Sequence, residues 1–591
     1  MHGFETPRPV STGRPQAASA PPAARRTTRV HQPPSRFADV VYPLTRRPTA
    51  SLAIEGGSTP DGDRDTDWSM CIQDDIAASA ADDVPNSHHE AMASSEAAQW
   101  KAAELSELAQ LQSQGTWRKQ PVPQGRKAIG VRWTYAKKRD EDGNVVKYKA
   151  RLVCKGFSQV FQQDYFESSS SVSKPATLRL VLALASAAGY SIVQADADNA
   201  YVQAPLEEEI YIDQPEGHEV DDSKLRLLKA LYGLKQSGLA WYKHLHAILV
   251  AFGYEACVND PCLFTRVKDG HLQLICVYVD DFVLCGINKN TTDALLDELE
   301  TKVKLKRQGD IHHLLGMKIT YDQNARSLSM SQEAYAKKVL QRFGLHEGHP
   351  KGTPDFQDDD VAWADDAQPK ADQALYRAIV GSLVYLTICT RPDLAYTVQR
   401  LSCQLHDPRD VHMNAAKRAL RYLLGTTSLG IKYEGASTKL QGYCDASWAP
   451  PPDRKSITGY LWCIGKTPIS WKSSRQRIVA LSSCEAEYIA AAEACKDMLW
   501  ILNLLEELIG TLDTVPLYCD NKSAIATASS TAVKERSKHI DTRYHFIRDL
   551  VDDKTVELKY VPTTEMLADA LTKKSNNHAL ERFRASAMVE A

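Results

Sequence analysis

Two adjacent acidic residues inside an apolar run constrain this chain more than any other feature. The run extends from Leu272 to Cys285, and Asp280 and Asp281 interrupt it within the sequence Tyr-Val-Asp-Asp. Its length and composition predict two buried strands that meet at the acidic residues. Because burying an unpaired carboxylate costs several kcal/mol, we expect a divalent cation to lie against them. The alternative is an ordinary hairpin, since Asp is a common turn residue.

A second acidic residue follows another short apolar segment. Asp196 comes after Ile192 and Val193, where a predicted strand leaves the core. We expect Asp196 and Asp280 to lie on adjacent strands and to hold two metal ions ~3.5–4 Å apart. Strand alternation places Asp281 on the opposite face.

The C-terminal region carries acidic residues on separate predicted elements. Asp445 lies in a strand, Asp520 ends another strand, and Asp569 begins a late helix. A further helix begins near Ser482 and offers two candidates, Glu485 and Glu487, which face different sides because they are two residues apart. Four such carboxylates can surround two Mg²⁺ ions. The alternative is a set of solvated acidic residues in loops.

Composition and charge narrow the class of protein. The 591 residues predict roughly three to five domains. The formal net charge is only −3, but twelve Lys or Arg and three acidic residues lie between Thr116 and Lys155. This local excess, with aromatic residues between the cations, favours phosphate binding over a solvated face. Thirteen scattered cysteines without a CxxC pair indicate a reduced, intracellular protein and no zinc motif. No signal segment or run of 18 apolar residues is present, so we expect no membrane span.

The order of predicted elements suggests several units. Residues 1–87 are rich in Pro, Ala, Ser, Thr, Arg and Asp, which is typical of a disordered linker. The apolar spacing predicts helices at 91–112, 178–188, 239–252, 291–306 and 331–343, and further helices up to about 424. It predicts a basic hairpin from the strands 129–137 and 145–154, and a final αβ unit from about 440 to 574.

Several ordered motifs resemble one known family. They are Lys149–Val153, the Asp196 segment, Glu207–Gly217, Leu231–Gln236, Tyr278–Asp281, Tyr376–Tyr385 and Thr390–Asp393. In this order they resemble the reverse transcriptase of copia-type long-terminal-repeat retrotransposons. The acidic residues of the C-terminal unit resemble those of the ribonuclease H domain attached to these polymerases.

The resemblance implies an α+β multidomain fold. It implies a right-hand polymerase with fingers and palm at 88–347 and a helical thumb or connection at 348–436. A ribonuclease H-like mixed-sheet α/β domain is expected at 437–578, and a tail at 579–591.

The resemblance also implies two activities, RNA-directed DNA polymerase and ribonuclease H. Each active site would use two Mg²⁺ ions, with Mn²⁺ as a substitute. The expected partners are template RNA, primer, deoxynucleoside triphosphates, RNA–DNA hybrid and a second copy of the chain, with retroelement capsid and integrase supplied separately. The expected location is the cytoplasm, in virus-like particles, with entry into the nucleus.

The resemblance gives roles to individual residues. Lys137 and Arg151 would grip the incoming triphosphate, as suits a Lys point charge and a planar Arg fork, unless they are surface charges. Tyr201 would exclude a ribose 2′-hydroxyl, unless it is an ordinary core aromatic. Gly233 and Gln236 would support the templating base and the nucleotide sugar; a tight glycine turn is the alternative.

The family register favours Glu487 over Glu485 as the nuclease acid. The catalytic set is therefore Asp196, Asp280, Asp281, Asp445, Glu487, Asp520 and Asp569, and all of these except Asp281 are expected metal ligands.

The chain departs from the family pattern at four places. Ser169–Ser171, Gln162–Gln163, Ser237–Leu239 and His312–His313 replace residues that are usual there. A Ser in place of a core Phe costs several kcal/mol if the position is buried. The departures support an alternative, a degenerate and inactive retroelement protein that only binds nucleic acid.

Overall fold

The structure is a computed structural model of the whole chain. It describes residues 84–139, 144–356, 368–450, 454–530, 544–575 and 577–590. Residues 1–83 of the predicted linker lie outside the described residues. No helix of the described part is long and apolar enough to cross a membrane.

The first described region contains the predicted basic hairpin. Strands β2 (Val131–Arg139) and β3 (Val145–Cys154) pair antiparallel, and the helices α2 (His88–Ala93) and α3 (Ala97–Ser113) precede them. A small sheet has the order β1 (Trp117–Lys119), β6 (Leu225–Leu227) and β5 (Tyr211–Ile212). The apolar side chains of α3, the hairpin and this sheet form one core cluster, which holds the hairpin against α3.

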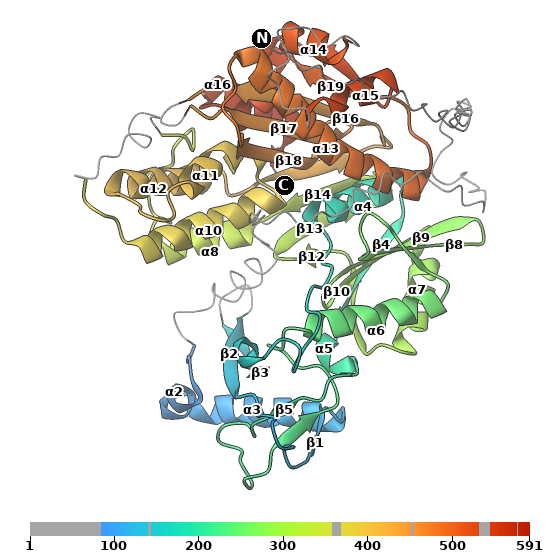
Figure 1. Cartoon of the computed structure of the whole chain (residues 1–591), viewed down its shortest axis with the longest axis vertical. Coiled ribbons are helices and arrows are strands. Elements are labelled where there is room, and N and C mark those ends of the chain that lie inside the picture. The colour runs from blue at the N-terminus through green and yellow to red at the C-terminus, as the bar shows by residue number, and fades with distance from the viewer. Residues whose placement is uncertain are drawn as a thin grey trace, which may run out of the picture. The chain divides into compact units, whose positions relative to one another are not determined.

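A six-stranded antiparallel sheet carries the predicted acidic hairpin. Its order is β11 (Leu305–Asp310), β4 (Ser191–Ala197), β10 (Asp281–Gly286), β9 (His271–Tyr278), β8 (Leu263–Lys268) and β7 (Glu255–Ala256). One face packs on α6 (Ser237–Ala251) and α7 (Lys289–Glu300), and the other on α4 (Pro175–Ala188) (Figure 1). Because both faces are covered, β9 and β10 are almost continuously apolar.

A second sheet shows that two predicted domain boundaries do not match the fold. Its strands are, in order, β12 (His313–Leu314), β13 (Met317–Asp322), β14 (Ser327–Ser331), β15 (Leu429–Glu434) and β21 (Val589–Glu590). The expected limits at 347/348 and 578/579 cut this sheet, since its strands come from both sides of each limit. The sequence missed this because such short strands carry little periodic signal.

Helices surround this second sheet. They are α8 (Glu333–Arg342), α10 (Gln373–Cys389), α11 (Ala395–Ser402) and α12 (Asp410–Leu424). Three of these helices, α10, α11 and α12, fall in the region predicted to be helical, and β15 lies at its end. The predicted tail is instead the helix α16 (Asn577–Ala587) followed by β21, and Phe583 and Met588 are buried against Leu461.

The C-terminal unit contains a five-stranded mixed sheet. Its order is β18 (Thr467–Arg475), β17 (Ile457–Ile464), β16 (Leu440–Ser447), β19 (Val515–Cys519) and β20 (Val556–Tyr560), and the pairs β16–β19 and β19–β20 are parallel. The 27-residue helix α13 (Ser483–Ile509) lies against it (Figure 1). The indole of Trp462 in β17 donates to the carbonyl of Ala494 in α13 at 3.1 Å, which fixes the helix on the sheet. The shorter helices are α14 (Lys522–Ala528) and α15 (Phe546–Asp552).

Two of the four sequence departures are structurally mild. Ser169 and Ser171 are exposed, so no buried Phe has been lost there. His312 and His313 are also exposed, and both of their backbone amides donate to the Gln194 side chain. Among the described residues, neither histidine belongs to a cluster that could hold a metal.

The Thr390–Asp393 motif forms a buried ion pair. Arg391 and Asp393, 1% and 2% exposed, make two hydrogen bonds of 2.9 and 2.7 Å. The Tyr422 hydroxyl donates to the same carboxylate at 2.5 Å, and Arg391 also donates to the Thr426 carbonyl. The two charges are thus paired with each other inside the protein, and the motif joins α10 to α12.

Removing one partner of this pair should destabilise the fold strongly. Asp393→Asn leaves the buried guanidinium without its counter-charge, so we expect a loss of about 3–5 kcal/mol, measured by urea denaturation. The control is Glu434→Gln, which removes an exposed ion pair with Lys432 and should cost less than about 1 kcal/mol. Equal losses in the two variants would contradict the structural role of the motif.

Candidate active sites

The pairing of β4 with β10 builds the first acidic site. Asp196 and Asp281 are direct partners across the two strands, and the amide of Ala197 donates to the carbonyl of Asp280 at 2.7 Å. Asp280 lies in the two-residue turn between Tyr278 and Asp281. Partners opposite each other in an antiparallel pair point to the same face, so Asp281 shares its face with Asp196.

The expectation that Asp281 faces away is therefore wrong. It assumed a regular strand through Tyr278–Asp281, whereas Val279 and Asp280 form the turn and alternation does not apply there. Val279 has φ +57°, which is costly for a β-branched residue. The Trp241 indole donates to the Val279 carbonyl at 2.6 Å and thereby holds this turn in place.

Burial and neighbouring charges raise the pKa of two of these carboxylates, Asp281 and Asp196. Burial, followed by the charges of Asp280 and Asp196, raises the pKa of Asp281 to about 7. Burial and the Asp280 charge also raise the pKa of Asp196, while Lys149 and Lys138 oppose the shift. The charges named as causes of these shifts bring residues 196, 280 and 281 into one electrostatic cluster, whereas the sequence analysis grouped only Asp196 and Asp280 and placed Asp281 on the opposite face.

The register of the basic hairpin decides which cations face this cluster. Lys138, Lys149 and Arg151 belong to one face, because Ala136 pairs with Lys149 and Thr134 with Arg151. Burial, Arg151 and Lys138 lower the pKa of Lys149, and the Asp196 charge opposes this shift. The sequence did not single out Lys138 or Lys149, since only the register reveals their face.

Lys137 lies on the other face of the hairpin. Its side chain is 3% exposed, and its ammonium is 2.7 Å from the Glu96 carboxylate and 5.9 Å from the centre of the Trp100 ring. The structure thus places this predicted triphosphate ligand against α3, away from the acidic cluster. The physical reason is alternation: neighbouring residues of a strand point to opposite faces.

Arg151 and Tyr201 lie together near the acids. The guanidinium is 4.7 Å from the centre of the Tyr232 ring, and that ring is 4.7 Å from the ring of Tyr201. Nε of Arg151 is buried without a hydrogen-bond partner. Burial and the Asp280 charge raise the pKa of Tyr201. A buried donor without a partner beside an acidic cluster is suited to bind an anionic ligand.

Gly233 and Gln236 have internal structural roles. Gly233 has φ +88°, and a Cβ there would lie 2.2 Å from the Cys154 carbonyl oxygen. Gln236 is 2% exposed; it accepts from Gln159 and donates to the Asp164 carbonyl, both at 2.9 Å. The structure thus favours the alternative reading of Gly233, a tight turn, and leaves little of the Gln236 amide available to a ligand.

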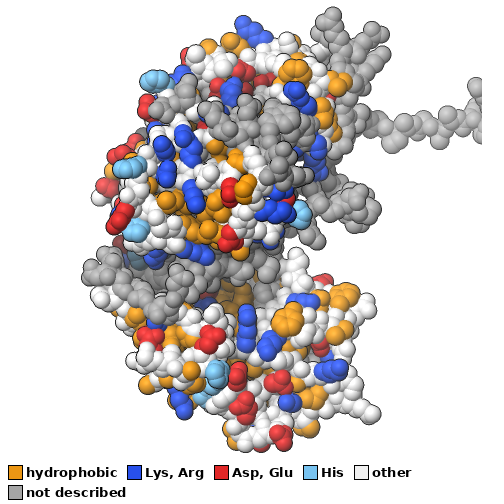
Figure 2. All heavy atoms as spheres, turned by 90° about the vertical axis from the view of Figure 1, so that its left-hand side faces the viewer, with side chains coloured by type: hydrophobic (Ala, Val, Ile, Leu, Met, Phe, Trp, Pro, Cys, Tyr) orange, Lys and Arg blue, Asp and Glu red, His pale blue; other side chains and the backbone are white. Residues whose placement is uncertain are grey.

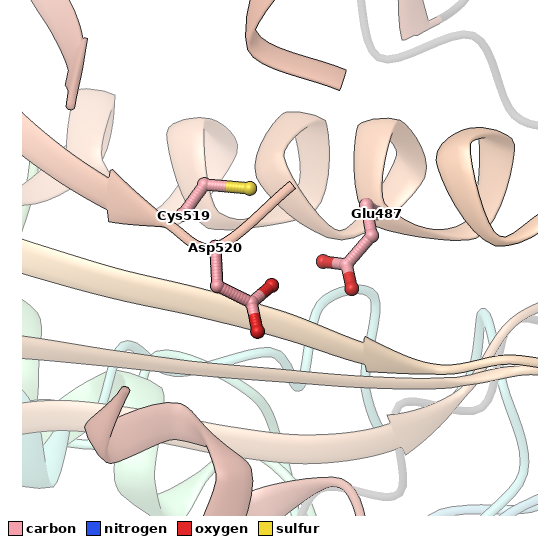
Figure 3. A group of neighbouring side chains, drawn as sticks. All are labelled: Glu487, Cys519 and Asp520. Carbon is pink, nitrogen blue, oxygen red and sulfur yellow. The ribbon is translucent and has the colours of Figure 1, made fainter. Parts of the chain in front are cut away.

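The second acidic site gathers all four predicted nuclease acids. One ligand oxygen from each of Asp445, Asp520 and Asp569 lies within 4.8 Å of the others. Asp520 also lies within this distance of Glu487 and of the Cys519 sulfur (Figure 3). Asp445 comes from β16, Glu487 from α13, Asp520 from the end of β19 and Asp569 from a short 3₁₀ helix at Leu567–Leu571. Asp520 connects the two groups.

Glu487 rather than Glu485 faces the site. Glu485 accepts from the Leu481 amide at 2.7 Å, and its own amide donates to the Ser482 hydroxyl, so it acts as a helix cap. Glu487 is 6% exposed, and its Oε2 has no hydrogen-bond partner. This geometry agrees with the choice that the family register suggested.

Three neighbours that the sequence did not single out hold these acids. Lys573 lies 2.7 Å from Asp569 and 3.8 Å from Asp445. Thr572 donates to Asp445, and Thr563 donates to Asp520 at 2.6 Å. The sequence offered one signal for Lys573. It lies four residues after Asp569, a spacing that brings two side chains together on a helical turn.

Burial and mutual repulsion perturb this site too. Burial raises the pKa of Asp445 to about 6, with Lys573 opposing and Asp569 reinforcing the shift. Burial, Asp445, Cys519 and Asp520 raise the pKa of Glu487 to about 10. Several carboxylates thus lie close together, and Oε2 of Glu487 has no hydrogen-bond partner. Such a group of oxygen ligands is suited to bind divalent cations.

Opposite charges mix on one face of the molecule. On the face drawn in Figure 2, Lys and Arg side chains are interspersed with Asp and Glu. This mixture agrees with the net charge of −3. The positive potential near the first acidic cluster therefore comes from the cations that the hairpin register places on one face, and not from the overall charge.

The comparisons with known proteins concern both regions. A family model described as reverse transcriptase (RNA-dependent DNA polymerase) matches residues 114–357. The chain is 38% identical to the Retrovirus-related Pol polyprotein from transposon TNT 1-94 of Nicotiana tabacum over 83% of its own length and 38% of that protein. It is 31% identical to the putative transposon Ty5-1 protein of Saccharomyces cerevisiae, over 51% of this chain and all of that protein.

A solved structure of the foamy viral protease-reverse transcriptase with double-stranded DNA is also similar. The TM-score is 0.44 at 12% identity, over 79% of this chain and 70% of that one.

The described residues form an α+β fold with one acidic cluster beside an antiparallel sheet and a second beside a mixed C-terminal sheet. The antiparallel palm sheet joins its acidic hairpin to a basic finger hairpin, and the C-terminal sheet combines three antiparallel strands with two parallel ones. The chain belongs to the reverse transcriptase family of copia-type retrotransposon Pol polyproteins. It spans 38% of the length of the tobacco relative.

The raised pKa of Asp281 predicts a pH-dependent stability without divalent ions. Its pKa of about 7 in the folded state exceeds the value of about 3.9 for an unfolded Asp, so the folded state binds the proton more tightly. Stability should then fall as the pH rises from about 4 to about 7. Asp281→Asn removes this contribution, and the variant should be the more stable form at pH 8, by up to about 4 kcal/mol.

Urea denaturation of both forms across this pH range, in the presence of a chelator, measures the effect. The exposed Asp222→Asn serves as control and should follow the parent protein. The free energies of unfolding of Asp281→Asn and the parent should therefore differ by an amount that changes with pH. A constant difference from pH 4 to pH 8 would refute burial and neighbouring charge as the cause of the raised pKa.

Proposed function

We propose that this chain is an RNA-directed DNA polymerase with a separate ribonuclease H centre. The observation that carries the proposal is the presence of two distinct acidic clusters, one in each sheet, within a chain of this family. The substrates would be template RNA, a primer and deoxynucleoside triphosphates for the first centre. For the second centre the substrate would be the RNA strand of an RNA–DNA hybrid.

In the polymerase centre, Asp196 and Asp280 would hold two Mg²⁺ ions, and Asp281 stands directly across from Asp196. When bound, these ions would activate the primer hydroxyl and neutralise the leaving pyrophosphate. Arg151 would bind the triphosphate through its unpartnered Nε, with Lys149 and Lys138 adding positive charge. Tyr201 would lie against the nucleotide sugar and exclude a 2′-hydroxyl.

In the nuclease centre, Asp445, Glu487, Asp520 and Asp569 would hold Mg²⁺, which supplies an activated water and stabilises the leaving 3′ oxygen. Thr572, Thr563 and Lys573 keep three of these carboxylates in fixed orientations. A Lys573 ammonium within 4 Å of two carboxylates would also orient them before the cations bind.

The rival function is that of a degenerate protein that binds nucleic acid without catalysis. Two predicted substrate ligands favour it, because Lys137 pairs with Glu96 and Gln236 is bonded internally. Against it stands the retention of every predicted acid in one of two clusters. Binding of an RNA–DNA hybrid without incorporation or cleavage would decide for the rival.

The first activity prediction concerns Asp280. Asp280→Asn should reduce extension of an oligo-dT primer on poly-rA with magnesium by at least about 100-fold, because a ligand of the first cluster is lost. Cleavage of a preformed hybrid should remain. Full extension by this variant would contradict the assignment of the polymerase centre.

The second activity prediction concerns Asp445 and the other acidic cluster. Asp445→Asn should reduce cleavage of the RNA strand in a labelled hybrid by at least about 100-fold and should leave primer extension intact. Each variant is thus the folded control for the other. Loss of both activities in either variant would mean that the division into two centres is wrong.

A further inference from the structure

The nuclease centre contains two donor groups of different chemistry. Asp445, Asp520 and Asp569 offer oxygen alone. The second group replaces one oxygen with sulfur: Glu487, Cys519 and Asp520 place two carboxylate oxygens and one Sγ within 4.8 Å of one another (Figure 3). The proposed hydrolysis uses the carboxylates and gives the sulfur no task.

Glu487 is buried and aimed into the second group, with one carboxylate oxygen that has no hydrogen-bond partner. It is 6% exposed, its Oε2 makes no hydrogen bond, and its carboxylate extends from α13 toward Cys519 and Asp520 (Figure 3). A buried carboxylate oxygen without a donor is costly, so this position favours a cation.

Cys519 is a free and deeply buried thiol at the end of β19. It is 1% exposed, and the backbone amide of Asn521 donates to its sulfur at 3.4 Å. A thiolate is the form of cysteine that binds metal, so metal binding here requires the Cys519 thiol to lose its proton. The sulfur lies within 4.8 Å of a carboxylate oxygen of Glu487 and of one of Asp520 (Figure 3).

Ligand chemistry distinguishes the ions that would suit this group. Mg²⁺ requires oxygen ligands in near-octahedral geometry. Zn²⁺ accepts a thiolate together with carboxylates, and three protein ligands plus one water make a tetrahedral site. The group of Glu487, Cys519 and Asp520 has the number and type of donors that zinc prefers.

We propose that Glu487, Cys519 and Asp520 form a zinc site, and that zinc bound there inhibits hydrolysis at the nuclease centre. The Cys519 thiol releases its proton to solvent as the Zn–S bond forms. Zinc then occupies Glu487 and Asp520, so these residues no longer serve the magnesium ions. The polymerase centre lacks such a site, since no described cysteine belongs to a metal-holding cluster with Asp196, Asp280 or Asp281.

The inhibition rests on the proposed nuclease function, but the binding of the metal does not. Binding is therefore tested first and without any activity. Co²⁺ is the probe in place of Zn²⁺, because a cobalt–thiolate bond gives a charge-transfer band in the near ultraviolet. The full chain should show this band, and added Zn²⁺ should abolish it by displacement.

Two variants and one control locate the site. Cys519→Ser should lose the band, and Glu487→Gln should weaken cobalt binding by at least about tenfold. The control Cys463→Ala removes a buried thiol on β17 and should keep the band. Absence of the band in the parent chain, or its persistence in Cys519→Ser, overturns the proposal.

Hybrid cleavage and primer extension then test the consequence. With constant Mg²⁺, micromolar Zn²⁺ should inhibit cleavage, and Cys519→Ser should require at least about tenfold more zinc for the same inhibition. Equal zinc sensitivity of the two forms overturns the inhibitory role. If the chain fails to cleave hybrid in magnesium alone, the proposed nuclease function is wrong, while the cobalt spectrum still decides on the metal site.

Discussion

Both candidate centres depend on holding several carboxylates together inside sheets that largely exclude water. Asp445 is 1% exposed, and Asp281 lies directly across from Asp196 in a sheet packed on both faces. The apolar contacts of these sheets must offset the repulsion and desolvation of the acids. The raised pKa values of Asp281 and Glu487 express this cost, and cations bound by the carboxylates would relieve it.

The surroundings of the acids differ between the centres. The polymerase acids face a basic hairpin, whose register presents Lys149 and Arg151 to them. Among the described residues, the acids of the C-terminal cluster instead contact the cation Lys573 and hydroxyl donors of the same region. The first arrangement suits an anionic substrate that arrives between hairpin and palm, and the second suits carboxylates that must keep a fixed geometry.

The two regions are joined by direct contacts as well as by the chain. Arg179 of α4 donates to the carbonyls of Ile388, Cys389 and Ile469, and the Glu507 carboxylate at the end of α13 accepts from the amides of Val258 and Asn259. The same helix carries Glu487 near its beginning. Packing of α13 on both regions therefore links the nuclease acid to the palm through one continuous element, as a rigid helix does.

The sequence by itself determined the acidic hairpin and the basic hairpin, because apolar runs and turn residues encode them locally. The class of fold and the choice of Glu487 among the acids came from ordered motifs that resemble a known family. Only the tertiary structure decided their surroundings. Strand register turned Lys137 toward Glu96 and brought Asp281 beside Asp196, and long-range pairing made the C-terminal residues part of the sheet of β15. Register and long-range pairing depend on contacts between residues far apart in the chain, so no local pattern of residues records them.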